Sequence, residues 1–366
     1  MSDSHADSSE ERAQSHWCFR LSSLISPEAA AADASDAIGA VEFDPTGRLL
    51  ATAGIARKIR LYGLAALLPP APDQSEPHAA VSERSAACRL CICAPAKLSS
   101  LRWRPGSDGR VIGSGDYDGV VTEYDVERNA VVLERDEHGG RRVWSVDYSA
   151  SGDLGASGSD DGTVQLWDPR CGGSGRAAAV MRAGGPVCGV EFDPEGGPWV
   201  AAGSADRRAY VFDARAGAAG PVATLGGHER AVTYARFAQG WRRLVTSGTD
   251  GTHRLWEWEQ GRQVRAYRGH SNARSFVGMS VWRGAGLIGS GSESEEVFVY
   301  DLRWEDPIWV QGFRRRRQES GSSGNGFVGA VSWIQLPSDG EPGALAAGAS
   351  DGTLQVFVTT KISNSY

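Results

Sequence analysis

The sequence has no apolar run long enough to cross a membrane and no signal-peptide pattern at its N-terminus. It also has no excess of positive charge, because 45 acidic residues outnumber 38 lysines and arginines and give a formal net charge of -7. A general basic surface that neutralises nucleic-acid phosphates is therefore disfavoured, although a local basic patch is not. These absences predict an intracellular protein that binds neither membranes nor nucleic acid.

Cysteine is scarce, and its six positions are too scattered to suggest a disulfide framework. Cys88, Cys91 and Cys93 form a C-x2-C-x-C motif, which resembles one half of the ligand set of a zinc site. A closed zinc site needs four ligands, and no second pair of Cys or His at ligand spacing follows. We therefore expect free thiols, no metal and no other cofactor, and the alternation through 88–95 predicts a strand.

Motifs for phosphate binding are also lacking. The glycines of 113–119 (GSGDYDG) are followed neither by Gly-Lys-Ser/Thr nor by a helical pattern. A backbone cradle for phosphate depends on both features. This segment therefore predicts a strand, a turn and a second strand.

Glycine and tryptophan are plentiful, with 47 and 12 residues, and they recur at a regular period. Residues 143–168 contain an alternating apolar strand, a glycine turn, a strand of small residues, an Asp-Gly turn and a third strand ending in Trp-Asp. The pattern returns six more times, and most intervals are 43 to 45 residues. The aromatic residues that end the third strands are Tyr62, Tyr124, Trp167, Phe212, Trp256, Tyr300 and Phe357.

Seven such repeats predict an all-β fold, a seven-bladed WD40 β-propeller at 15–360. An isolated strand at 16–22 is expected to close the ring against 329–358, which leaves no major unpaired edge. The strand at 88–95 would then be the outer strand of the second blade. We expect the remaining segments to be a disordered acidic N-terminus at 1–14, long loops at about 63–87 and 304–328, and a short tail at 361–366.

Two blades contain the residues of a buried hydrogen-bonded chain from Trp through Ser or Thr and His to Asp. The same residue types would make a catalytic Ser-His-Asp triad. Recurrence at the blade period, each time ending on Trp, favours a structural role, so no catalysis is predicted. The two sets are His138, Ser157, Asp161 and Trp167, and His228, Thr246, Asp250 and Trp256.

Two further motifs each leave two interpretations open. The WD-x-R box at Trp167, Asp168 and Arg170, with variants at 212–215 and 300–303, either stabilises strand ends or docks on a partner. The basic tetrad Arg314 to Arg317 is either a solvated charge run or an exposed nuclear import signal.

Several stretches resemble the WD40 domain of the plant constitutively photomorphogenic ubiquitin ligase and its relatives, over residues 16 to about 360. That ligase carries a RING finger and a coiled coil before its propeller, whereas this chain begins its propeller almost at once. The chain is therefore more similar to the repressor-of-UV-B-photomorphogenesis family of stand-alone propellers. The stretches that carry the resemblance are 41–62, 96–103, 114–126, 137–149, 203–215 and 268–281.

This resemblance implies a negative regulator that binds the UV-B photoreceptor, returns it to its inactive dimer and competes with the ligase, in nucleus and cytoplasm. It also implies a link to flowering time. It implies a top-face site in which aromatic residues form an apolar floor for a Val-Pro peptide and cations hold its acidic flanks. Ala273, Arg207 and Arg230 stand where the ligase has an acid, His and Lys, which leaves the peptide preference open. The implied site residues are Lys97, Tyr117, Arg142, Trp144, Arg230 and Phe276.

The sequence therefore predicts a non-catalytic interaction protein, monomeric when alone. The alternative is a substrate receptor that docks on the adaptor of a cullin-RING ubiquitin ligase through the WD-x-R box. A general scaffold without a role in light signalling is a third interpretation, and it requires an inert Val-Pro site.

Overall fold

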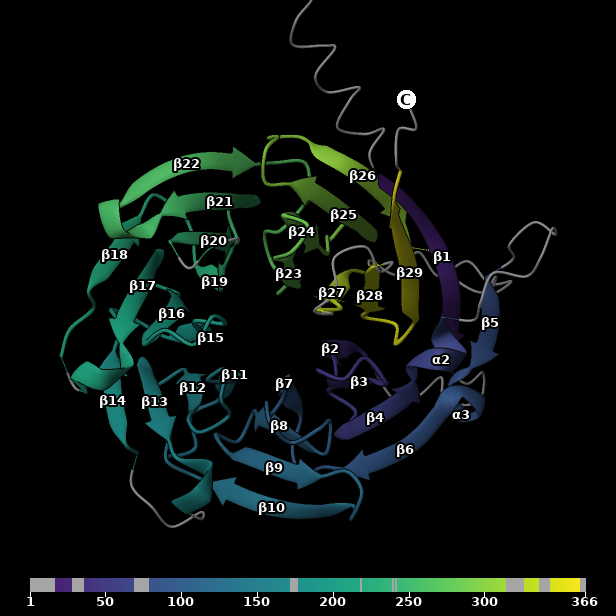
Figure 1. Cartoon of the computed structure of the whole chain (residues 1–366), viewed down its shortest axis with the longest axis horizontal. Helices are drawn as coiled ribbons and strands as arrows, with labels where there is room; N and C mark the ends of the chain where they lie inside the picture. The colour runs from purple at the N-terminus through teal and green to yellow at the C-terminus, as the bar shows by residue number, and fades with distance from the viewer. Residues whose placement is uncertain are drawn as a thin grey trace, which may run out of the picture.

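The computed structural model describes residues 17–27, 36–68, 79–171, 177–217, 219–238, 240, 242–313, 326–335 and 343–362. Seven sheets stand around a central axis, and each runs outward from an inner strand (Figure 1). The predicted seven-bladed WD40 β-propeller is confirmed. The expected disorder at 1–14 and the arginines at 314–317 lie outside the described residues.

The first four blades each contain four strands. Blade 1 has β2 (Ile38–Phe43), β3 (Leu49–Gly54), β4 (Lys58–Gly63) and β6 (Cys88–Cys93). Blade 2 has β7 (Leu98–Trp103), β8 (Val111–Asp116), β9 (Val121–Asp125) and β10 (Ala130–Arg135). Blade 3 has β11 (Val143–Tyr148), β12 (Gly155–Ser159), β13 (Thr163–Trp167) and β14 (Ala179–Arg182). Blade 4 has β15 (Val187–Phe192), β16 (Trp199–Ser204), β17 (Arg208–Asp213) and β18 (Ala223–Gly226).

The remaining blades and three short 3-10 turns complete the ring. Blade 5 has β19 (Val232–Phe237), β20 (Arg243–Gly248), β21 (Thr252–Glu257) and β22 (Arg262–Tyr267). Blade 6 has β23 (Met279–Trp282), β24 (Leu287–Ser290), β25 (Glu296–Asp301) and β26 (Pro307–Gly312). Blade 7 has β27 (Val328–Trp333), β28 (Gly343–Ala349), β29 (Leu354–Lys361), β1 (Trp17–Ser26) and β5 (Ala80–Glu83). The 3-10 turns are η1 (Pro169–Cys171), η2 (Ala214–Ala216) and η3 (Trp258–Gln260).

The N-terminal strand closes the ring. β1 pairs antiparallel with β29, from Trp17 opposite Lys361 to Ile25 opposite Leu354. In Figure 1 the purple β1 accordingly lies beside the yellow β29. Because the last blade draws strands from both ends of the chain, it can form only when those ends meet.

The described parts of the first insertion, 63–68 and 79–87, are more ordered than the loop expected at 63–87. They form the short helices α2 (Leu64–Leu67) and α3 (Arg84–Ala87), and β5 pairs parallel with β1. The hydroxyls of Ser22 and Ser23 donate to the Leu67 carbonyl oxygen at 2.9 and 2.7 Å. This insertion therefore packs against the strand that closes the ring.

Two further expectations need correction. The expected loop at 304–328 includes β26, the outer strand of blade 6. The cysteine-rich segment at Cys88–Cys93 is indeed an outer strand, but it pairs with β4 and so completes the first blade rather than the second. Each repeat supplies the outer strand of the preceding blade, so the predicted position is one blade too far along the chain.

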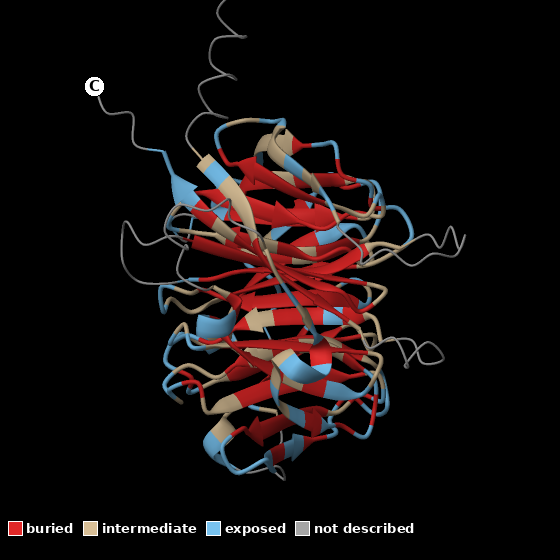
Figure 2. Ribbon diagram, turned by 90° about the vertical axis from the view of Figure 1, so that its right-hand side faces the viewer, coloured by how far each residue is buried: buried red, intermediate tan, exposed pale blue. Residues whose placement is uncertain are grey.

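The apolar core lies within and between the blades (Figure 2). One cluster, for example, joins Leu166 and Met181 of blade 3 to Val190 and Phe192 of blade 4. Burying each such side chain contributes about 1.5–3 kcal/mol to the free energy of folding, so packing between neighbouring blades holds the sheets in the ring. None of the described helices has the length and apolar character needed to span a membrane.

Candidate functional site

The inner strands bulge where they enter the central channel. Six of them show a register shift after their first residue. A bulge turns the extra side chain out of the regular alternation. In blade 3 this extra residue is Trp144, whereas the equivalent residue in blade 5 is Thr233. The bulge therefore places a large aromatic side chain at the mouth of the channel.

Four of the predicted site residues meet there, and we call Tyr117, Arg142, Trp144 and Phe276 the top cluster. The rings of Trp144 and Phe276 stack with centroids 4.4 Å apart at 20°. The Tyr117 ring is tilted at 53° with its centroid 6.2 Å from that of Trp144. Arg142 Cζ lies 4.0 Å from the Tyr117 centroid and 4.5 Å from that of Trp144, within the range of cation–π attraction. All four side chains are half-buried.

The other two predicted residues lie on loops attached to the top cluster. Lys97 is exposed, and its carbonyl oxygen accepts from the Tyr117 N–H at 2.9 Å. Arg230 is also exposed, and its Nη1 donates to the Ala273 carbonyl oxygen at 3.4 Å. Within the described part of the chain, neither cation forms a salt bridge, and the same is true of Arg142. The site therefore offers positive charge beside an apolar surface.

Two acidic residues that the sequence did not single out fix this geometry. Asp160 Oδ1 accepts from the indole N–H of Trp144 at 2.6 Å. Glu293 Oε1 accepts from the backbone N–H groups of Arg274 and Ser275, both at 2.6 Å. Burial alone would raise the pKa of Glu293, but these backbone donors hold it below its usual value. Because the bonds hold the indole and the Phe276 loop in place before a ligand arrives, less ordering remains to be done on binding.

The top cluster opens on a cavity of about 390 Å³ along the channel axis. Tyr117, Trp144 and Phe276 all contribute to its wall. The cavity reaches down to charged side chains on the inner strands, including Arg102 and Glu191. An aromatic mouth above a charged floor could accept an apolar anchor and an anion at different depths.

The predicted buried chain is complete in blade 5. Trp256 Nε1 donates to Thr246 Oγ1 at 2.8 Å, and this hydroxyl lies 2.8 Å from His228 Nε2. His228 Nδ1 lies 2.9 Å from Asp250 Oδ2. Burial would raise the pKa of Asp250, but the bond from His228 and that residue's charge hold it far below its usual value. This arrangement is structural, because both histidine nitrogens are engaged inside the blade.

The equivalent chain in blade 3 is shorter than expected. His138 bonds Ser157 and Asp161, both at 2.8 Å. The indole nitrogen of Trp167 does not reach Ser157, and the ring packs edge-on against Tyr148 with centroids 6.1 Å apart. Gly155 permits this ring position, because a Cβ there would lie 2.8 Å from Trp167 Nε1. In blade 5, Leu244 pairs with Trp256 and fills this space.

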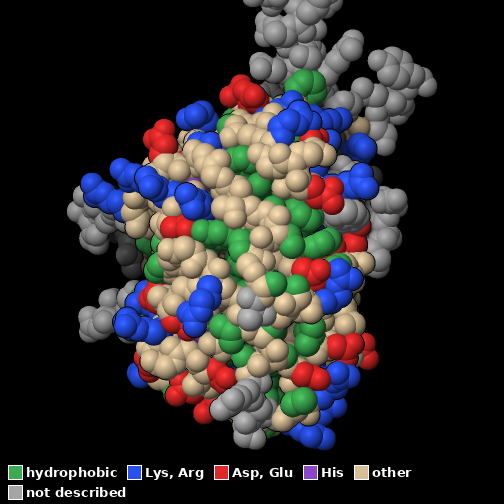
Figure 3. Space-filling view, turned by 90° about the vertical axis from the view of Figure 1, so that its left-hand side faces the viewer, with side chains coloured by type: hydrophobic (Ala, Val, Ile, Leu, Met, Phe, Trp, Pro, Cys, Tyr) green, Lys and Arg blue, Asp and Glu red, His purple; other side chains and the backbone are tan. Residues whose placement is uncertain are grey.

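The WD-x-R box forms a closed ion pair on the outer rim. Arg170 donates through Nε and Nη2 to the two oxygens of Asp168, at 2.9 and 2.8 Å. These bonds lower the pKa of Asp168 to about 2. The same fork recurs at 213–215 and 301–303. Acidic and basic side chains are interspersed on the rim face that carries β14 and β18 (Figure 3), so this surface has no single sign of charge.

Comparisons with known proteins agree with this architecture. The family model "WD domain, G-beta repeat" matches residues 131–168 and 219–257. The chain is 56% identical to the WD repeat-containing protein RUP2 of Arabidopsis thaliana over 333 residues, which cover 89% of this chain and 88% of that protein. It is 53% identical to the WD repeat-containing protein RUP1 of the same plant over 344 residues, which cover 93% and 84%.

A longer relative matches through part of its length. The E3 ubiquitin-protein ligase COP1 of Arabidopsis thaliana is 33% identical over 328 residues, which cover 88% of this chain but 44% of the ligase. These matches confirm the resemblance seen in the sequence motifs. The chain belongs to the family of WD repeat-containing proteins that includes RUP1 and RUP2.

Proposed function

We propose that this chain is a non-catalytic regulator that binds the plant UV-B photoreceptor and promotes its return to the inactive dimer. A Val-Pro peptide of the photoreceptor would bind the top cluster, and a second contact would engage the photoreceptor core. The single observation that carries the proposal is the stacked pair Trp144–Phe276 next to Arg142, which has no salt bridge within the described residues. The negative regulator would act in nucleus and cytoplasm, where it competes with the constitutively photomorphogenic ligase.

The chemistry of the top cluster suits such a peptide. Valine and proline bury apolar surface against aromatic rings, and the rigid proline loses little conformational freedom on binding. Acidic residues beside the Val-Pro pair would meet Lys97, Arg142 and Arg230. Charge-assisted bonds to arginine are among the stronger polar contacts, so the cations would set the position and direction of the peptide.

Calorimetry with an acidic Val-Pro peptide tests the site. Trp144→Ala should weaken binding about 30-fold, as expected for loss of a central aromatic anchor worth about 2 kcal/mol. Trp309→Ala is the matched control, because it removes a half-buried tryptophan from β26 on the outside of the ring. Equal affinities of Trp144→Ala and the unmodified protein would contradict the site.

A second assay tests the role. Monomeric photoreceptor is mixed with this chain, and recovery of the dimer is followed by gel electrophoresis over time. A regulator that binds states along the path to the dimer more tightly than the monomer should accelerate recovery. An unchanged rate in the presence of bound protein would reject the regulatory role while leaving the peptide site intact.

The rim favours a second candidate function, that of a substrate receptor for a cullin-RING ligase. Arg170 is 66% exposed and is held in a fixed orientation by Asp168, which suits a docking contact. Arg170→Ala should abolish capture of the cullin adaptor and leave photoreceptor binding unchanged. Arg215→Ala, the same fork one blade further on, is the control. Adaptor capture that survives Arg170→Ala would count against this function.

A further inference from the structure

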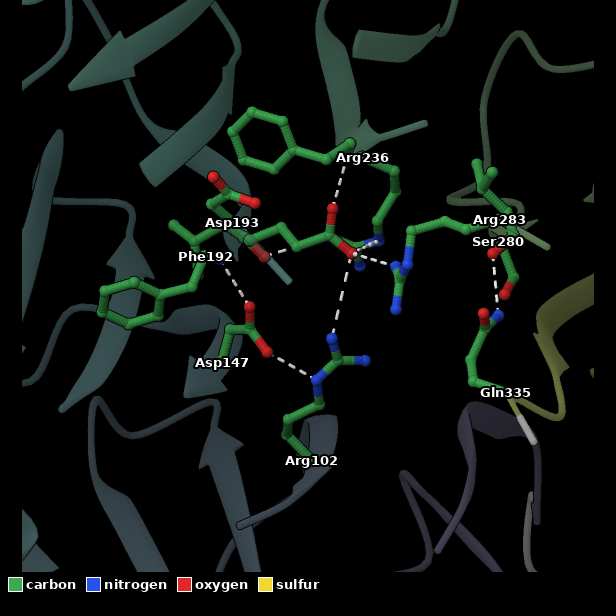
Figure 4. Close-up of polar contacts among 12 residues, drawn as sticks. Arg102, Asp147, Phe192, Asp193, Arg236, Ser280, Arg283 and Gln335 are labelled. Carbon is green, nitrogen blue, oxygen red and sulfur yellow. Dashed lines mark hydrogen bonds and ion pairs between the residues drawn. The ribbon is translucent and has the colours of Figure 1, made fainter. Parts of the chain in front are cut away.

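The floor of the central channel holds a concentration of arginines. Arg102, Arg236 and Arg283 come from blades 2, 5 and 6 and point toward a common centre (Figure 4). Each lies close to one oxygen of Glu191, with nitrogen-to-Oε1 distances of 3.8, 3.8 and 3.7 Å. These distances are too long for good hydrogen bonds, so three guanidinium groups surround one carboxylate oxygen without hydrogen bonding to it.

The arginines on the two sides of the channel differ in how many hydrogen bonds they donate. On the side of blades 1 to 3, Arg102 donates to Asp147 at 2.5 Å and to Glu42 at 2.7 Å. On the opposite side, Arg236 donates to the carbonyl oxygen of Val190 at 2.9 Å. Arg283 has no hydrogen bond within the described residues beyond its long ion pair. Unused donors therefore gather on the side of blades 5 and 6.

Glu191 is poorly placed to satisfy these donors. Its Oε2 accepts from the backbone N–H of Phe237 at 2.5 Å, which fixes the carboxylate to the neighbouring blade. Burial raises its pKa despite the nearby arginines. The charged groups that line the cavity are four cations, Arg102, Arg236, Arg274 and Arg283, and three carboxylates, Glu42, Asp147 and Glu191.

We propose that the channel binds a small tetrahedral oxyanion, as free phosphate or as the phosphate group of a small metabolite, between Arg236 and Arg283. The cavity of about 390 Å³ has room for such a group. The side chains of Arg236 and Arg283 are 17% and 27% exposed, so both face accessible space. A tetrahedral anion presents oxygens in several directions, and can accept from two guanidinium forks on different blades at once, as a planar carboxylate held at one edge cannot.

This site shares the cavity with the top cluster but uses other side chains, Arg236 and Arg283, than the proposed peptide contact. An anion held there would link blades 5 and 6 at the channel floor and stabilise the ring. Binding to the folded state alone raises the melting temperature as ligand concentration increases. The inference therefore extends beyond the proposed function and does not depend on it.

The test is calorimetry of the full chain with inorganic phosphate and, separately, with glucose 6-phosphate, at an ionic strength matched with sodium chloride. We expect one binding site and a melting temperature that rises with either ligand. Arg283→Gln should weaken binding about tenfold or more, because it removes a charge-assisted contact. Arg283→Lys should restore part of the affinity, because it keeps the charge but loses the fork.

Arg215→Gln is the matched control, since this arginine is 71% exposed on the rim and should leave phosphate binding unchanged. Binding of glucose 6-phosphate alone would assign the site to a metabolite, and binding of inorganic phosphate alone would assign it to the free ion. Absence of binding for both ligands would overturn the proposal. So would equal affinity in Arg283→Gln and the unmodified chain.

Discussion

Blades 3 and 5 carry the same four residue types at the same spacing, yet they use them differently. In blade 5 the bonds run unbroken from Trp256 through Thr246 and His228 to Asp250. In blade 3 the equivalent series ends at Ser157, and the Trp167 indole turns away. A shared sequence signature therefore does not guarantee a shared hydrogen-bond network.

The two blades also differ in the turn that follows the second strand. Blade 3 has adjacent aspartates there, and Asp161 bonds His138 while Asp160 bonds Trp144. Blade 5 has Thr249 in the position of Asp160, and Asp250 bonds His228. Blade 3 thus adds a carboxylate that orients the top cluster, whereas blade 5 uses its turn for stability alone.

Removing the central histidine should give the largest difference between the blades. His228→Ala removes the histidine partner of Asp250, whose side chain is 6% exposed, and breaks the bond to Thr246. Loss of one member of such a buried pair costs about 3–5 kcal/mol. His138→Ala should cost less, because Asp161 is 22% exposed and water can replace part of the bond. Urea unfolding at neutral pH measures both, and equal losses would contradict the comparison.

A methyl group at the glycine of blade 3 tests the cause of the difference. Gly155→Ala places a Cβ in the space taken by the Trp167 indole and should cost about 1–3 kcal/mol by overpacking. A smaller loss would accompany rotation of the indole to Ser157, which a crystal structure of the variant would reveal. Gly220→Ala is the control, because a Cβ there meets nothing within 4 Å. Equal stabilities of the two variants would show that Gly155 does not set the ring position.

The sequence was sufficient to predict the ring, because the repeat fixes strand order and the isolated first strand has one partner that closes the sheet. It was not sufficient to place Trp167. The motif specifies the four residue types, whereas the rotamer of the indole depends on the residue that pairs with it, Gly155 or Leu244. That cross-strand pair becomes apparent only when the register is known.

The candidate site was predictable to a similar extent. The motifs indicated Trp144, at the start of β11, and Phe276, on the loop before β23, which are more than 130 residues apart and stack in the structure. Asp160 and Glu293 were missed, because each lies in a hairpin turn where acidic residues are common. The arginines of the channel floor were also missed, since their convergence depends on which blades face one another across the axis.

The doubled aspartate of blade 3 allows the binding and structural roles to be separated. Asp160→Asn keeps the size of the side chain but weakens the bond from Trp144 and should reduce affinity for an acidic Val-Pro peptide about fivefold to tenfold, with little change in stability. Asp161→Asn should have the reverse effect, because Asp161 bonds the buried His138. Calorimetry and urea unfolding of both variants would show whether Asp160→Asn lowers the peptide affinity and Asp161→Asn lowers the stability. Loss of peptide affinity in Asp161→Asn alone would contradict the division.

Exchange of each tryptophan for phenylalanine should give the smallest difference and the most direct test of the broken network. Both variants lose part of a buried ring, but Trp256→Phe also leaves the Thr246 hydroxyl without its indole donor. The net worth of such a bond is about 1 kcal/mol, so Trp256→Phe should be less stable than Trp167→Phe by roughly that amount. Combining each change with removal of the hydroxyl, Thr246→Val or Ser157→Ala, isolates the pairwise energy. A coupling in blade 3 as large as that in blade 5 would mean that Trp167 bonds Ser157 in solution. Coupling confined to blade 5 would show that the Trp167 indole stands outside the hydrogen-bonded series of its blade.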